Sequence, residues 1–128
     1  MILLLDTSTS ECRVTLVDGE TRHDYTWQAD RDLAHGLLEY IVARLAEHDR
    51  AVADLSGVGV FRGPGSFTGL RIGITTLNTI AASEHIPIVG TLGETWQIDA
   101  LARLNAGEDD QIVLPEYGRD ARITTPRK

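Results

Sequence analysis

The chain has 128 residues, of which 42% are hydrophobic and 24% charged, so it has the length of one domain and the composition of a globular protein. These values exclude a disordered or fibrous chain, and no run of 18 apolar residues suggests a membrane span. The net charge of −7 opposes tight binding to a nucleic-acid backbone, because that affinity comes from clustered lysines and arginines.

The ends of the chain and its single cysteine suggest a compartment. The N-terminal run MILLLD has no basic region ahead of it, so we expect no signal peptide. Cys12 is typical of a reducing environment and excludes an internal disulfide, so we expect a cytoplasmic protein. Residues 119–128 carry a net charge of +3, and we expect residues 116–128 to form a basic tail that is either solvated or in contact with RNA or an acidic partner.

The first thirty residues have the pattern of three antiparallel strands. Residues 2–6 (ILLLD) are an apolar run typical of a buried central strand with Asp6 at its end. Residues 12–18 alternate in part, and the dipeptide Asp18-Gly19 is a strong hairpin signal that leads into a further strand over 20–28.

Helical and strand patterns then alternate. Apolar residues recur at helical spacing over residues 31–48, and Asp30 is placed to cap that helix. An apolar strand over 55–61 precedes a second helix over 66–82, which Ser66 is placed to cap.

Toward the C-terminus, residues 86–90 predict a short strand. Thr91 and Glu94 have the spacing of a capping box that opens a third helix, which reaches about Leu104. Residues 111–115 (QIVLP) favour a last strand.

Three antiparallel strands followed by β-α units predict an α/β fold of the ribonuclease-H-like class. Its mixed sheet would need right-handed crossovers between the parallel strands. We expect a single lobe of this kind over residues 1–115, followed by the basic tail.

The segment 63–73 (GPGSFTGLRIG) joins the second buried strand to the second helix and contains four glycines. Glycine-rich turns at a helix N-terminus can bind phosphate, but the P-loop pattern fails after Gly69 and the dinucleotide pattern fails at Thr68. Asp6 is a plausible Mg²⁺ or nucleotide contact, although its position favours a turn-forming Asp that accepts backbone N–H bonds. The candidate nucleotide contacts come from this segment and the end of the first strand: Asp6, Thr7, Ser8, Gly63 and Gly65.

Gly69 and Gly73 lie inside the second predicted helix, where a glycine costs on the order of 1 kcal/mol relative to alanine. They are four residues apart, so they share one face and leave a bare strip that another backbone can approach. This strip either packs on the chain's own sheet or contacts another subunit, and in the second case leucine at either position would abolish association and leave the monomer folded. The expected interface residues are apolar positions of both long helices and the two glycines: Leu33, Leu37, Ile41, Leu45, Phe67, Gly69, Leu70, Gly73, Ile74 and Leu77.

The sequence offers little for catalysis. No H-x-x-x-H or H-E-x-x-H pair occurs among His23, His35, His48 and His85, so we expect no metal site and no bound cofactor. Ser66 resembles a nucleophile elbow only loosely, because that motif requires a glycine two residues later. We therefore expect no catalytic residue.

Two stretches carry a family resemblance. LLLDTSTSECRVTLVD over residues 3–18 and LSGVGVFRGPGSFTGLRIGITT over 55–76 closely resemble the TsaB (YeaZ) family of bacterial accessory subunits for threonylcarbamoyladenosine synthesis on tRNA. With the helix between them and the segment IPIVGTLGETW, the resemblance spans roughly residues 2–105.

The resemblance implies a sugar-kinase/Hsp70/actin-like fold without catalytic residues. Family members pair through helices that correspond to residues 31–48 and 66–82, either with themselves or with the paralogous catalytic subunit TsaD, and an ATPase, TsaE, joins that complex. The resemblance therefore implies an accessory subunit that scaffolds a TsaD-type subunit, forms a homodimer when alone and meets tRNA only indirectly.

Two features depart from the family. Members usually have a second lobe, whereas LPEYGRDARITTPRK over 114–128 resembles the family's own C-terminus, so we expect a short form that lacks the second lobe. The segment DLAHGLLEYI over 32–41 lacks the His-Ser-Glu and proline positions of many members. The main rival hypothesis is a nucleotide-binding or phosphotransfer enzyme of the same fold, and a third is a small peptidase, for which the sequence shows no nucleophile-base pair.

Overall fold

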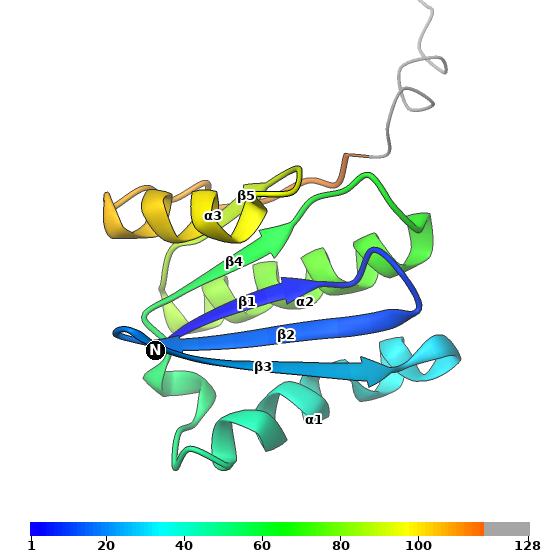
Figure 1. Cartoon of the computed structure of the whole chain (residues 1–128), viewed down its shortest axis with the longest axis horizontal. Coiled ribbons are helices and arrows are strands. Elements are labelled where there is room, and N and C mark those ends of the chain that lie inside the picture. Colours follow the sequence, from blue (N-terminus) through cyan, green and yellow to red (C-terminus); the bar gives the residue numbers. More distant parts are fainter. Residues whose placement is uncertain (117–128) are drawn as a thin grey trace, which may run out of the picture.

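The computed structural model describes residues 1–116 as a five-stranded mixed sheet with three α-helices (Figure 1). The strands follow the order β3-β2-β1-β4-β5 across the sheet. Their bounds are β1 Ile2–Asp6, β2 Glu11–Asp18, β3 Thr21–Gln28, β4 Gly57–Phe61 and β5 Ile88–Thr91. The helices are α1 Leu33–Ala46, α2 Phe67–Glu84 and α3 Trp96–Asn105. The predicted order of three antiparallel strands followed by β-α units is confirmed.

β1 lies at the centre of the sheet because its side chains are apolar on both faces. Leu3, Leu4 and Leu5 are fully buried, as expected for a strand that is covered on both sides. The strand pairs antiparallel with β2 and parallel with β4. Asp6 ends it, so the carboxylate stands where the chain leaves the sheet.

A tight hairpin links β2 and β3. Asp18 pairs with Thr21, so the loop consists of Gly19 and Glu20. Gly19 has a φ of 64°, which glycine adopts without the steric penalty of a side chain. The predicted Asp18-Gly19 hairpin is confirmed.

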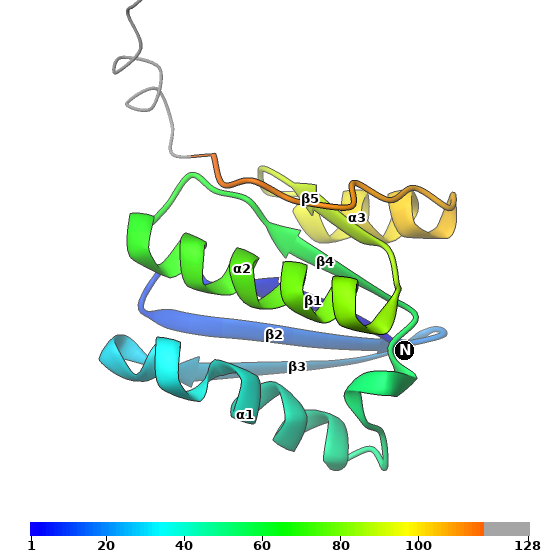
Figure 2. The ribbon, with the colours of Figure 1, turned by 180° about the vertical axis from the view of Figure 1, so that it is seen from behind.

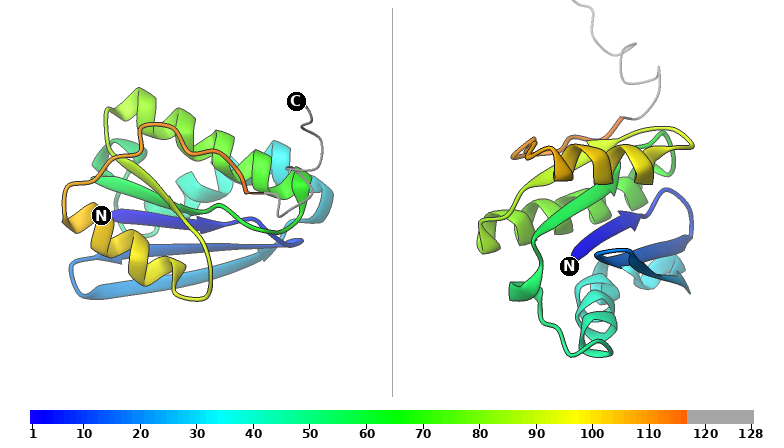
Figure 3. Two further views of the ribbon diagram at one scale, coloured as in Figure 1. Left: turned by 90° about the horizontal axis from the view of Figure 1, so that it is seen from above. Right: turned by 60° about the vertical axis from the view of Figure 1, so that its left-hand side comes forward.

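The helices cover the sheet unequally. Figure 2 shows α1 and α2 side by side across one face, where the larger core places their inward side chains against residues such as Leu5 and Val60. Helix α3 lies on the opposite face, over β4 and β5 (Figure 3), and Ala100 packs there with Leu4 and Val89. The side of the molecule formed by α1 and α2 therefore presents two neighbouring helices to solvent.

The first two helices begin differently from one another. Ser66 caps α2 as predicted, because its hydroxyl accepts a hydrogen bond from Gly69 N at 3.3 Å. Asp30 does not cap α1, so that prediction is wrong. It lies in a short 3-10 turn before the helix, and its carboxylate accepts a hydrogen bond from Gln28 Nε2 at 2.9 Å.

The third helix begins later than the sequence pattern predicts. Thr91 is the last residue of β5, and its hydroxyl donates to Trp96 O at 2.7 Å across the following turn. The predicted capping box of Thr91 and Glu94 is therefore wrong, because the strand retains the threonine and α3 begins at Trp96.

The outer edge of β5 is closed by three side chains and one backbone N–H group. Ile88 N donates to Asp109 Oδ1 at 3.1 Å, and Gly90 N donates to Asp110 Oδ2 at 2.9 Å. Ile88 O accepts from Asp110 N at 2.7 Å, and Gly90 O accepts from Arg103 Nη1 at 3.1 Å. The backbone groups of Ile88 and Gly90 are thus satisfied without a sixth strand.

We call residues 109–116 the strap. They run past this edge toward the N-terminal end of α2 (Figure 3). The predicted strand over 111–115 is wrong, because side chains and one isolated backbone bond, rather than a neighbouring strand, bind the backbone here. Leu114 O accepts a hydrogen bond from Arg62 Nε at 2.9 Å, and Glu116 N donates to Arg62 O at 2.8 Å.

Two sequence predictions concern the ends and surroundings of the chain. The expected basic tail over 116–128 lies, apart from Glu116, outside the described residues, and the single lobe over 1–115 stays a prediction as a domain boundary. No helix among residues 1–116 is long and apolar enough to cross a membrane.

Candidate subunit interface

Two turns meet beneath the start of α2. Ser66 N donates to Ser8 O at 2.8 Å, and the Thr7 hydroxyl donates to Gly69 O at 2.7 Å. A Cβ at Gly65 would overlap with Ser8, so glycine is required for this close approach. The turn after β1 and the turn before α2 therefore form one packed unit.

The glycine strip of α2 serves this internal packing. A Cβ at Gly69 would overlap with Thr7 O, and a Cβ at Gly73 would overlap with the Thr7 hydroxyl. Both glycines are buried. Of the two alternatives left open by the sequence, close packing within the chain is the one found, and the prediction that these glycines contact another subunit is wrong.

The candidate nucleotide contacts lie together, but the protein's own hydrogen bonds and close packing already occupy them. Asp6 Oδ1 accepts a hydrogen bond from Ser8 N at 2.8 Å, so the carboxylate shapes its own turn. Thr7 is 1% exposed, with its hydroxyl bound to Gly69. Gly63 has a φ of 118°, and a Cβ there would overlap with a backbone oxygen of the strap. Nucleotide binding by this set stays a prediction.

The described residues offer no ready reactive group at these turns. Among residues 1–116, no three His, Cys, Asp or Glu side chains gather as metal ligands would. Burial, with a smaller contribution from the charge of Asp6, raises the pKa of the Cys12 thiol to about 12. The thiol is therefore protonated near neutral pH, and a thiolate nucleophile is not available there.

Most of the apolar residues expected at a subunit interface are in the chain's own core. The structure buries seven of them: Leu33, Leu37, Ile41, Leu45, Leu70, Ile74 and Leu77. Their expected contact with a partner is wrong, because the sheet already covers the faces of α1 and α2 that carry them. Of the ten residues predicted, only Phe67 is exposed, at 54%.

A second apolar stripe on α1 faces outward, and the sequence reasoning missed it. Leu38 is 53% exposed and Val42 is 44% exposed, and both follow Ala34 at steps of four residues. The sequence does show this second stripe at helical spacing. Each of its residues follows a residue of the buried stripe, such as Leu33 or Leu37, by one position.

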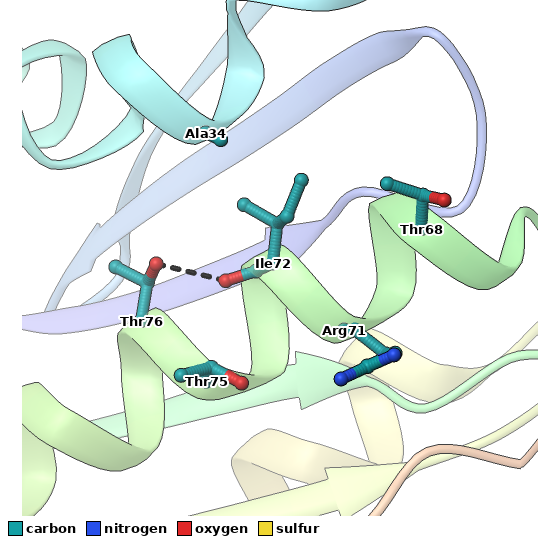
Figure 4. A pocket seen from close by; sticks show the side chains of 6 residues that line it. All are labelled: Ala34, Thr68, Arg71, Ile72, Thr75 and Thr76. Carbon is teal, nitrogen blue, oxygen red and sulfur yellow. Dashed lines mark hydrogen bonds between the residues drawn. The ribbon is translucent and has the colours of Figure 1, made fainter.

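A groove lies between the two stripes of exposed residues on α1 and α2. It has a volume of about 360 Å³, and Figure 4 shows Ile72 of α2 pointing toward Ala34 of α1. Thr76, which also lines it, donates its hydroxyl to Ile72 O at 2.8 Å (Figure 4). The remaining lining residues are Thr68, Arg71 and Thr75.

The exposed side of α2 is almost free of charge. The helix has 18 residues, and only Arg71 and Glu84 among them are charged. A surface helix usually exposes several charged side chains, so an uncharged exposed side is a feature of helices that pack against something else. Its exposed residues are Phe67, Thr68, Arg71, Thr75, Thr79, Ala82 and Ser83.

We call the outward side of the two helices the α1–α2 face. It consists of an outward stripe on α1 and the exposed side of α2: Ala34, Leu38, Val42, Phe67, Thr68, Arg71, Thr75 and Thr79. The face combines exposed apolar side chains with hydroxyls whose methyl groups also reach the surface. Such a surface can bury apolar area against another helix without leaving many polar groups unpaired.

Comparison with known proteins places the chain in a family. The model of the family "TsaD: tRNA N6-adenosine threonylcarbamoyltransferase" matches residues 27–93, which is just over half of the chain. The protein named tRNA threonylcarbamoyladenosine biosynthesis protein TsaB in Escherichia coli is 29% identical over 93% of this chain and 55% of its own length. The protein of the same name in Bacillus subtilis is 35% identical over 94% of this chain and 50% of its own length.

Solved structures agree with these relatives. A crystal structure of a Pseudomonas aeruginosa protein described as similar to the peptidase YeaZ matches with a TM-score of 0.67 and 31% identity, over 71% of this chain and 42% of that one. A second structure, described as YeaZ from the same organism, matches with a TM-score of 0.63 and 29% identity, over 71% and 44% of the two chains. The chain spans about half the length of the curated relatives it matches. It belongs to the tRNA N6-adenosine threonylcarbamoyltransferase (TsaD) family, and within that family to the TsaB/YeaZ group.

Proposed function

We propose that this chain is a non-catalytic accessory subunit in the synthesis of threonylcarbamoyladenosine on tRNA. In this proposal it docks onto the TsaD-type catalytic subunit and stabilises it, and contact with tRNA is made by that partner. The names of the relatives in Escherichia coli and Bacillus subtilis support the pathway, since both are called threonylcarbamoyladenosine biosynthesis proteins.

The observation that carries the docking role is the α1–α2 face. Leu38 and Val42 expose apolar surface to water, which does not stabilise a monomer. The neighbouring side of α2 carries one exposed charge, that of Arg71. Two adjacent helices with such surfaces fit the packing of ridges into grooves against helices of a partner.

The internal use of the polar turn residues supports a scaffolding rather than a catalytic role. The hydroxyl of Thr7 binds the start of α2, and the carboxylate of Asp6 is occupied within its own turn. A nucleotide at this position would have to compete with these bonds. The rival hypothesis of a nucleotide-binding or phosphotransfer enzyme is therefore not favoured.

The proposed partners share one surface. We infer that the chain forms a homodimer through the α1–α2 face when alone, and that a TsaD-type subunit replaces the second copy when it is present. The two assemblies would then exclude each other. A TsaE-type ATPase would join after the heterodimer has formed.

The test is binding of this chain to the TsaD-type subunit of the same organism, measured by calorimetry and by light scattering after size exclusion. The double variant Leu38→Glu/Val42→Glu places two charges on the α1–α2 face and should weaken binding by about 100-fold or more. The matched control is Ile98→Glu, which changes an apolar residue of α3 that is 69% exposed. Normal binding by the double variant, or no binding by the unchanged protein, would contradict the proposal.

A further inference from the structure

Arg71 is the one cation on the exposed side of α2. It lines the groove together with Thr68, Ile72 and Thr75, and Figure 4 shows its side chain on the side of α2 that is turned away from Ala34. Every other exposed residue of this helix is uncharged. A partner that covers the groove must therefore also cover, or lie beside, a single guanidinium group.

The guanidinium of Arg71 has no anionic partner within residues 1–116. Five arginines, among them Arg44, Arg50 and Arg103, do form an ion pair with a nearby carboxylate. Arg71 instead lies with its guanidinium carbon 5.4 Å from the centre of the Phe67 ring. This contact holds the side chain over one turn of the helix, which reduces the conformational entropy that it would lose on binding.

Burial of an unpaired guanidinium at an interface carries a large desolvation penalty. The penalty is offset when the partner supplies an acceptor, and a carboxylate accepts two parallel N–H bonds from a guanidinium. We infer that the docking partner presents a carboxylate side chain to Arg71, and that this ion pair fixes the register in which the two subunits meet. This inference rests on the proposed docking function.

The surroundings of Arg71 favour a carboxylate of a protein over a phosphate of nucleic acid. The groove lining contains one cation, and its other members are Ala34, Ile72 and three threonines. Nucleic-acid backbones are bound by several clustered cations, and the chain as a whole carries a net charge of −7. A helix with one acidic residue facing this groove satisfies both the apolar lining and the single charge.

The experiment compares Arg71→Glu with Arg13→Glu in binding to the TsaD-type subunit of the same organism. Both variants change the net charge equally, and Arg13 lies on β2, in an exposed ion pair with Glu11. Arg71→Glu should weaken binding at least about thirtyfold relative to Arg13→Glu. Added salt should also weaken the binding of Arg71→Glu less than that of the unchanged protein, because the substitution turns an attractive charge pair into a repulsive one.

Two further measurements separate the possible failures. Arg71→Lys retains a charge without the two parallel donors, so its binding should be intermediate between the unchanged protein and Arg71→Glu. If the unchanged protein binds and Arg71→Glu binds no more weakly than Arg13→Glu, the inference is overturned while the proposed function stands. If the unchanged protein does not bind at all, the proposed function itself fails. Circular dichroism of each variant checks folding, and Arg71→Gln replaces Arg71→Glu should the latter fail to fold.

Discussion

The side chain of Asn78 holds Val113 by two hydrogen bonds, as a neighbouring strand would. Asn78 Nδ2 donates to Val113 O at 3.0 Å, and Val113 N donates to Asn78 Oδ1 at 2.9 Å. Val113 is buried in the larger core, so the pair of bonds fixes both the position and the orientation of the strap.

We expect Asn78→Ala to release the strap, because it leaves both backbone groups of Val113 without partners. The free energy of unfolding should fall by about 1 to 3 kcal/mol, measured by urea titration. The amide of Val113 should also exchange its hydrogen faster. The control Thr79→Ala changes the next residue of α2, whose hydroxyl bonds only to Thr75 O in the same helix. Equal stability of the two variants would contradict this account of the strap.

A side chain at position 73 should destabilise the monomer itself. Gly73→Ala places a Cβ against the hydroxyl of Thr7, and overpacking of this kind costs typically about 1 to 3 kcal/mol. Urea unfolding of the variant at a concentration where the protein is monomeric measures the effect. The expectation from the sequence was that leucine here would spare the monomer, and the structure predicts the opposite.

A double-mutant cycle identifies the contact. Thr7→Ala removes the hydroxyl and methyl group that a Cβ at position 73 would meet. Gly73→Ala should therefore be less destabilising in the Thr7→Ala background than in the unchanged protein. Additive effects would mean that the helix shifts away from the turn and that the two residues are not coupled.

Asp110 should make the free energy of unfolding depend on pH in the acidic range. Burial acts to raise the pKa of its carboxyl, but the Arg103 guanidinium and Gly90 N–H bond to the charged form, and the pKa is lowered overall. A lowered pKa in the folded state means that ionised Asp110 stabilises the fold above the unfolded pKa of about 3.9. This stabilisation is lost as the pH falls through the folded pKa.

Asp110→Asn should lower the free energy of unfolding by about 1 to 3 kcal/mol at pH 7. The difference from the unchanged protein should shrink as the pH falls below about 4, because Asp110 then takes up a proton in the unfolded chain and, at still lower pH, in the folded protein. Urea titrations at pH 7 and at several values below pH 4 measure this. Glu20→Gln, in the exposed hairpin loop, serves as the control and should unfold like the unchanged protein. A constant difference at all pH values would show that the charge of Asp110 does not matter.

Cys12 should be inert to thiol reagents while the protein is folded. Its pKa of about 12 and its burial leave little thiolate near pH 8, so labelling by Ellman's reagent should be at least about 100-fold slower than in urea. The matched control places the cysteine in the hairpin loop, as Cys12→Ser/Glu20→Cys, where labelling should be rapid without urea. Rapid labelling of Cys12 in the folded protein would mean that β2 opens.

Local patterns in the sequence predicted most of the fold. The apolar run at Leu3, Leu4 and Leu5 located the central strand, and Asp18-Gly19 located the hairpin. These signals depend on neighbouring residues, which a sequence displays directly. The strap was mistaken for a strand because its partners, such as Asn78 and Arg62, are side chains distant in the sequence.

The candidate interface was harder to predict for a related reason. Helical spacing identified the leucines of α1, but two adjacent apolar stripes share that spacing, and only packing shows that Leu37 is inside and Leu38 outside. The glycines of α2 indicated a close backbone contact correctly. Their partner, Thr7, is more than sixty positions away in the sequence, so the pattern alone could not distinguish it from a second subunit.

The closed edge of β5 makes the two edges of the sheet different. An edge strand with unpaired amides and carbonyls is a template onto which further strands can add, and the outward backbone groups of Ile88 and Gly90 are already bound by Asp109, Asp110 and Arg103. Addition of a strand from another molecule at β5 would first require the bonds from these three residues to break. Among residues 1–116, β3 is the other outer strand of the sheet, and association through the helices would leave both edges as they are.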